Sequence, residues 1–137
     1  MQIQWYPGHM AKARRMLEEN LKLIDVVVEL VDARAPLATR NPDFDALFSQ
    51  KSRVILLNKS DLASAEQTKK WIEYYKAQNI NAIAFVSTSS AKRKAAVSLI
   101  EAAAADKVAK MKEKGVTKTV RAMVVGIPNV GKSTFIN

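Results

Sequence analysis

The sequence Gly126-Ile127-Pro128-Asn129-Val130-Gly131-Lys132-Ser133 lies close to the C-terminal end of this 137-residue chain. It follows the apolar run Ala122–Val125 and has the pattern G-x-x-x-x-G-K-S, in which backbone N–H groups surround the phosphates of a nucleotide. Lys132 is expected to reach the β- and γ-phosphates, and the Ser133 hydroxyl is expected to ligate Mg²⁺. The alternative is a glycine-rich turn after a buried strand. The predicted phosphate-binding residues are Asn129, Val130, Gly131, Lys132, Ser133 and Thr134.

The composition is typical of a globular protein with one domain. The hydrophobic content is 48%, and the chain is long enough to bury a core. A formal net charge of +9 at pH 7 favours polyanionic partners, namely nucleic acid, a nucleotide or an acidic membrane surface, although solubility alone also explains it. The sequence contains no cysteine, no apolar run long enough to span a membrane and no signal peptide pattern, so we expect a cytoplasmic protein.

Short apolar runs alternate with helical patterns along the chain. The predicted strands are 25–31, 54–57, 82–86 and 120–125. The predicted helices are 10–23, a short helix starting at Asn41-Pro42, a helix from the Ser64 cap to Lys76, and a long helix at 95–114 that ends at Gly115. Residues 1–24 are interpreted as an aromatic lead-in, with a turn at Pro7-Gly8, followed by a basic helix. All 137 residues are assigned to one domain.

This alternation predicts an α/β fold with three layers, in which helices cover both faces of a parallel sheet. Ligands of such folds bind beyond the carboxyl ends of the strands. Polar clusters at 32–36, 58–61 and 87–92 each follow a predicted strand, as does the phosphate loop. We therefore expect these four segments to share one edge of the sheet.

The segment Asn58-Lys59-Ser60-Asp61 matches N-K-x-D, a pattern that suits guanine. A carboxylate at Asp61 can accept hydrogen bonds from both N1–H and the exocyclic amine of guanine, whereas adenine offers no such pair of donors. The Lys59 stem is expected to pack over the base, and Asn58 to brace the loop or contact the base edge. A polar turn before the Ser64 cap is the alternative, but the phosphate loop in the same chain favours the guanine interpretation.

A guanine site also needs a backbone N–H that donates to guanine O6. Two segments could supply it: Ser87-Thr88-Ser89, directly after the strand, or Ser90-Ala91-Lys92, which has the familiar letters Ser-Ala-Lys. The letters favour the second segment and the position favours the first. An ordinary loop between strand and helix remains the alternative to both.

The base loop, the O6 loop and the phosphate loop occur here in a rotated order compared with Ras-like GTPases. Together with Trp5–Ala13 and Asp32-Ala33-Arg34-Ala35-Pro36, this order resembles the circularly permuted GTPases of ribosome assembly. The resemblance covers the whole chain. It implies a Ras-like P-loop fold, hydrolysis of GTP with Mg²⁺, and a role in maturing the large ribosomal subunit and its rRNA, with no oligomer expected.

The same resemblance suggests roles for two further residues. His9, the only histidine, would orient the attacking water, with a surface or capping histidine as the alternative. Asn129 matches a ligand of K⁺ in potassium-stimulated relatives. In this order of motifs both switch segments would follow Asn137, so we expect the chain to be an incomplete GTPase domain with an exposed edge at the phosphate-loop strand. The rival hypotheses are a non-catalytic basic module that binds nucleotide or RNA, and a P-loop protein that uses ATP.

Overall fold

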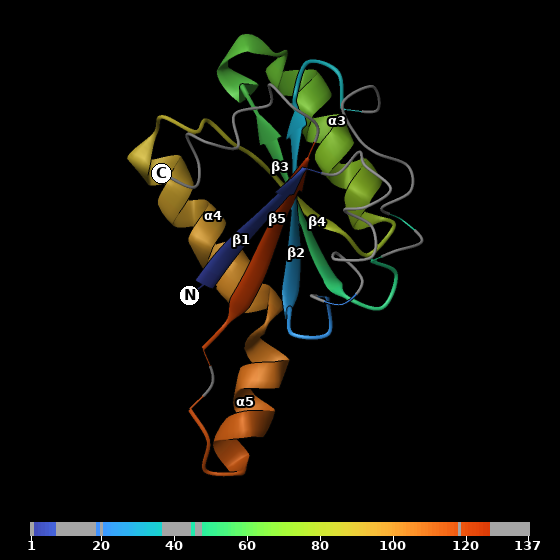
Figure 1. The fold of residues 1–137 in the computed structure, drawn as a ribbon. Helices are drawn as coiled ribbons and strands as arrows, with labels where there is room; N and C mark the ends of the chain where they lie inside the picture. Colours follow the sequence, from blue (N-terminus) through green and yellow to red (C-terminus); the bar gives the residue numbers. More distant parts are fainter. Residues whose placement is uncertain are drawn as a thin grey trace.

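The computed structural model describes the backbone of residues 2–7 and, with side chains, residues 19, 21–36, 45, 48–117 and 119–126. In this part of the chain five parallel strands form one sheet in the order β1-β5-β2-β3-β4 (Figure 1). The strands are β1 (Gln2–Pro7), β2 (Val26–Asp32), β3 (Ser52–Asn58), β4 (Asn81–Ala84) and β5 (Arg121–Gly126). The helices are η1 (Ser60–Leu62), α3 (Ala65–Lys76), α4 (Ser90–Ala103) and α5 (Ala105–Glu113).

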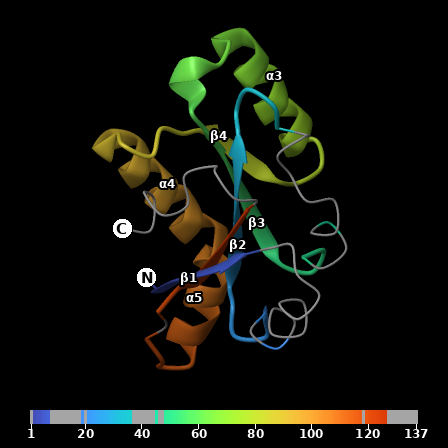
Figure 2. The ribbon, with the colours of Figure 1, turned by 45° about the horizontal axis from the view of Figure 1, so that its top comes forward.

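The sheet is covered on both faces, because its central strands bury the side chains on both sides. Every residue of β2 is buried, and alternate residues of this strand belong to different apolar clusters. Val28 packs in a cluster with Ala96 and Ile100 of α4, whereas Val31 packs in a cluster with Tyr75 of α3. Figure 2 shows α4 and α3 on opposite sides of the sheet. The predicted layered α/β fold is therefore confirmed.

Helix α3 begins where its cap predicts. The Ser64 side chain accepts a hydrogen bond from the Gln67 backbone N–H at 3.3 Å, which satisfies one of the donors at the start of the helix. The helix ends at Lys76, as expected. Its aromatic residues pack against one another, with Tyr75 fully buried beside Trp71 and Tyr74. This helix lies between β3 and β4 in the chain, and the loops that follow these two strands contribute residues to the site described below.

The helix predicted at 95–114 is wrong at its start and in its continuity. It begins five residues earlier, at Ser90, with Ser89 as its N-cap, and it breaks at Ala104. The Ala104 N–H bonds to the Glu101 carbonyl three residues back, so the last turn of α4 tightens and α5 leaves in a new direction. The buried face of α4 ends at this break, and α5 contains no buried residue and extends past the end of the sheet (Figure 1).

The N-terminal segment also differs from the prediction. Residues 2–7, interpreted from the sequence as part of an aromatic lead-in, form the strand β1, which pairs with β5 from Gln2 opposite Arg121 to Pro7 opposite Gly126. The strand leading to the phosphate loop therefore lies inside the sheet, and the predicted exposed edge at β5 is wrong. The predicted turn residue Gly8 and most of the helices predicted at 10–23 and after Asn41 lie outside the described residues.

Candidate nucleotide site

The carboxyl ends of β2, β3 and β4 meet at one edge of the sheet, as the parallel topology requires. Asp32 at the end of β2 lies opposite Asn58 at the end of β3, and the Ala33 N–H donates to the Asn58 carbonyl at 2.7 Å. Beyond β4, the Phe85 N–H donates to the Leu57 carbonyl at 2.9 Å. The segments that follow these three strands are therefore held in fixed positions relative to one another.

The loop Asn58–Asp61 is tied to the loop after β4 by three hydrogen bonds. Ser60 donates to the Phe85 carbonyl through its backbone N–H at 3.1 Å and through its hydroxyl at 2.9 Å. The Oδ1 atom of Asn58 accepts a hydrogen bond from the Ser87 N–H at 3.2 Å, and Asn58 is only 1% exposed. Asn58 thus braces the following loop from a buried position, which was one of the two roles expected for it.

The other two residues of this motif are more accessible. Lys59 adopts a left-handed backbone conformation with φ of 58°, which is uncommon for a residue with a side chain, and its side chain is 33% exposed. Asp61 lies in the short helix η1 and is exposed. No hydrogen bond or ion pair to another described residue involves its carboxylate. The loop therefore presents a carboxylate and a lysine stem to solvent while Asn58 and Ser60 fix its backbone.

Asp32 makes charged contacts with two basic residues at this edge. Arg34 donates from its backbone N–H and from Nε to Asp32 Oδ1 at 2.9 and 3.0 Å, and from Nη2 to Asp32 Oδ2 at 2.7 Å. The Lys59 ammonium lies 3.6 Å from the same Oδ2 atom. These hydrogen bonds from Arg34 lower the pKa of Asp32 from 3.8 to about 2, although burial opposes the change. The sequence placed Asp32 in a polar cluster but indicated no partner for it.

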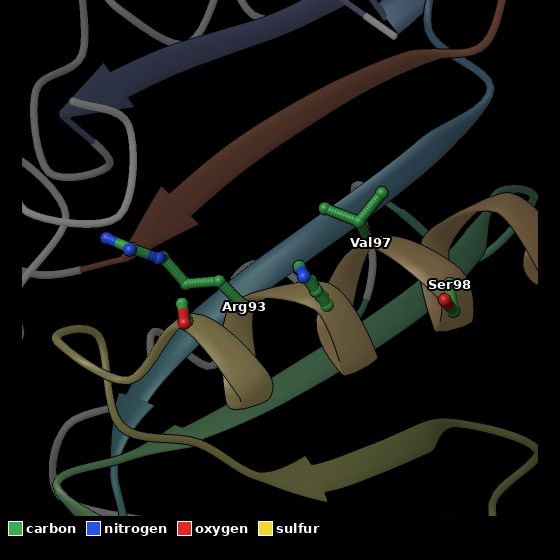
Figure 3. Close-up of a pocket in the computed structure, with 5 residues that line it drawn as sticks. Arg93, Val97 and Ser98 are labelled. Carbon is green, nitrogen blue, oxygen red and sulfur yellow. The ribbon is translucent and has the colours of Figure 1, made fainter.

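The structure separates the two candidate O6 segments. Ser87, Thr88 and Ser89 form the loop between β4 and α4, next to Asn58, whereas Ser90, Ala91 and Lys92 form the first turn of α4. Ser90 lines a groove on α4 together with Arg93, Lys94, Val97 and Ser98. In Figure 3 the Arg93 side chain extends from α4 in the direction of the C-terminal end of β5. The first segment is therefore the one whose backbone lies beside the N-K-x-D loop.

Several predicted site residues lie outside the described residues. These are His9 and the phosphate-loop residues Asn129, Val130, Gly131, Lys132, Ser133 and Thr134. Gly126, the first residue of the G-x-x-x-x-G-K-S pattern, is described. Within the described ranges no cluster of three or more His, Cys, Asp or Glu side chains could hold a metal ion. Helices of the described part are also too short or too polar to cross a membrane.

Comparison with known proteins reveals relatives along the whole chain. Ribosome biogenesis GTPase A of Priestia megaterium is 52% identical over 139 residues, which cover 100% of this chain and 48% of that protein. The protein of the same name from Bacillus cereus is 49% identical over 138 residues, covering 100% and 47%. The chain is a relative of ribosome biogenesis GTPase A. It spans about half the length of the curated relatives it matches.

A solved structure agrees with these relatives. The GNP-bound YlqF protein of T. maritima is 38% identical and superimposes with a TM-score of 0.65, covering 92% of this chain and 46% of that one. The chain thus has a P-loop GTPase fold, in which the strand before the phosphate loop is the last of the described strands in the sequence but lies between β1 and β2 in the sheet. No family model matches the chain.

Proposed function

We propose that the intact protein binds GTP and hydrolyses it as a switch in the assembly of the large ribosomal subunit. The observation that carries this proposal is the N-K-x-D loop, which Asn58 and Ser60 fasten to the loop after β4 at the carboxyl edge of the sheet. The relatives named ribosome biogenesis GTPase A support the assembly role, and the GNP-bound YlqF structure supports the nucleotide.

In this proposal guanine is recognised by three contacts. The exposed carboxylate of Asp61 accepts hydrogen bonds from N1–H and the exocyclic amine, and the Lys59 stem packs over the ring. The donor to guanine O6 is the Thr88 N–H. Its neighbours are already engaged, because the Ser87 N–H donates to Asn58 Oδ1 and the Ser89 N–H donates to the Val86 carbonyl at 3.0 Å. No acceptor among the described residues pairs with the Thr88 N–H.

The phosphates would lie at the end of β5, where Gly126 leads into the loop that carries Lys132. Ser133 would supply one oxygen to Mg²⁺, and Asn129 is a candidate ligand for K⁺. Asp32, at the carboxyl end of the neighbouring strand β2, is bonded to Arg34 on both oxygens. Asp32 is therefore not expected to be a further metal ligand. When bound, Mg²⁺ would neutralise charge that develops on the phosphates.

Hydrolysis requires a group that orients the attacking water, and His9 is proposed for that role. Replacing His9 with alanine in the intact protein should lower the rate of GTP hydrolysis while leaving GDP affinity unchanged, because the base contacts are made elsewhere. Single-turnover hydrolysis in the presence of the large subunit measures this. An unchanged rate would remove His9 from the mechanism.

The guanine assignment is tested by nucleotide titration of the intact protein and of Asp61→Asn. Loss of the carboxylate acceptor should weaken GDP binding about 100-fold, since hydrogen bonds to a charged group contribute roughly 1.5–3 kcal/mol each, and should improve binding of xanthosine diphosphate. Asp106→Asn on α5 is the matched control and should bind GDP normally. Tighter binding of ADP than of GDP would overturn the assignment in favour of an ATP-using protein.

The net charge of +9 favours a second candidate, a non-catalytic module that binds nucleotide or RNA. This candidate predicts RNA binding that does not change when GDP is replaced by a non-hydrolysable GTP analogue. A switch instead predicts that affinity for the ribosomal particle depends on which nucleotide is bound.

A further inference from the structure

We propose that Asp32 is a positioning residue for the guanine site, acting through the Lys59 ammonium to hold the lysine stem in place over the base. The inference rests on the proposed function, because it assigns Asp32 a role in the same site. It starts from three observations: the contacts of the Asp32 carboxylate, the backbone conformation of Lys59 and the register of β2 and β3.

The Asp32 carboxylate is fixed before any ligand binds. Its side chain is only 10% exposed, and the Arg34 guanidinium contacts both of its oxygens in a parallel arrangement that sets the plane of the carboxylate. The backbone around it is also fixed, because Ala33 bonds to Asn58 across the two strand ends. Asp32 is therefore a rigid negative charge at the start of the base loop.

Lys59 has the opposite character. Its side chain has four rotatable bonds and is one-third exposed. Its backbone is in the left-handed conformation, at the point where the chain leaves β3 and enters η1. A lysine in such a position loses considerable rotamer freedom when it is confined to one geometry over a base. The Asp32 oxygen 3.6 Å from the ammonium confines the end of the side chain and so lowers the entropy lost on binding.

Arg34 adds a second cation to the Asp32 carboxylate. A single carboxylate shared between a guanidinium and an ammonium leaves the group with one excess positive charge, at an edge where anionic phosphates are proposed to bind. Arg34 itself is 48% exposed, so water screens much of its charge. The order of the strands places Asp32, at the end of β2, between the strand of the phosphate loop and the strand of the base loop.

A double-mutant cycle tests this role in the intact protein. GDP affinity is measured by titration for the unsubstituted protein, Asp32→Asn, Lys59→Met and the double variant. Methionine keeps an apolar stem of similar length but removes the ammonium. Each single variant should bind GDP about fivefold more weakly than the unsubstituted protein. The double variant should lose no more GDP affinity than the single variants do, because both changes break the same contact. Additive losses would overturn the role of Asp32 through Lys59.

Two controls separate positioning from folding. Asp25→Asn removes a carboxylate at the other end of β2, where it pairs with Lys107, and should leave GDP affinity unchanged. Lys59→Arg restores a cation within reach of Asp32 and should recover affinity to within about twofold, whereas Lys59→Met should not. The comparison of Lys59→Arg with Lys59→Met tests the role of the ammonium even if Asp32→Asn does not fold. Lys59→Met with normal GDP affinity would overturn the proposal, whereas absence of GDP binding in the unsubstituted protein would overturn the proposed function itself.

Discussion

Two acidic residues on β2 lie three positions apart and each pairs with an arginine, yet their surroundings differ. Glu29, in the middle of the strand, is 1% exposed and pairs with Arg53 of β3, which also contacts Asp45 at 3.0 Å. Asp32, at the carboxyl end, pairs with the half-exposed Arg34 and lies beside Lys59. The first pair connects two strands inside the protein, and the second fixes a charge at the edge where ligands of such sheets bind.

The position of an ion pair along β2 therefore determines whether the pair contributes to folding alone or also to ligand binding. A buried pair gains little net stability, but loss of one partner leaves the other charge desolvated, so its removal is costly for folding. A pair at the strand end remains close to water and to the loops that receive a ligand. Substitutions at Glu29 should therefore affect folding, and substitutions at Asp32 should affect binding as well as folding.

The largest effect is expected for Glu29→Ala. Among the described residues, it leaves the buried Arg53 guanidinium with the exposed Asp45 as its remaining charged partner, so the free energy of unfolding should fall by about 3 kcal/mol. Chemical denaturation monitored by circular dichroism measures this. Glu66→Ala, which removes an exposed pair with Lys70, should change stability by less than about 0.5 kcal/mol. Similar losses of stability for the two variants would show that burial of the Glu29–Arg53 pair does not increase the effect of removing one partner.

A smaller and pH-dependent effect is expected for Asp32→Asn. Because the pKa of Asp32 is lowered from 3.8 to about 2, its stabilisation is fully present above pH 4 and is lost as the pH falls through about 2. The free energy of unfolding should therefore differ between the two proteins by about 2 kcal/mol at pH 7 and converge near pH 2. Unfolding curves across this range test the sign. A difference that does not depend on pH would contradict the ion-pair origin.

The smallest effect is expected for Ser60→Ala. It removes the hydroxyl bond to the Phe85 carbonyl but keeps the backbone bond to the same atom, so stability should fall by about 1 kcal/mol. GDP affinity should fall a fewfold, because the base loop is less firmly attached to the loop after β4. Titration and thermal unfolding of the same samples give both values. A loss of stability with unchanged GDP affinity would separate this loop from the site.

Much of this architecture follows from local patterns that the sequence displays. The buried strands β2, β3 and β5 are continuous apolar runs, and the Ser64 cap specifies the start of α3, so each was predicted close to its observed bounds. The base loop was also predictable, because N-K-x-D after a strand has a chemical meaning of its own. These features depend on residues that are neighbours in the sequence.

The features that were missed depend on partners distant in the sequence. Residues 2–7 become a strand because β5 offers an edge for pairing more than 110 positions later, and the alternation of Ile3 and Trp5 with glutamines was the only local signal. The break at Ala104 lies in a run of alanines that favours helix throughout, so no local signal marks it. The contact of Lys59 with Asp32 likewise requires the register of two strands.

The location of the guanine site at the carboxyl edge of the sheet can be tested most directly by recording amide ¹H–¹⁵N spectra of the intact protein while GDP and Mg²⁺ are added. A guanine site at the carboxyl edge predicts that the described amides with the largest shifts are those of Asn58–Asp61 and Ser87–Ser89, with Thr88 foremost. The amides of Asp25, Arg53 and Lys107 at the opposite end should not move. Shifts centred on that opposite end, or none in the base loop at saturating GDP, would contradict the assignment.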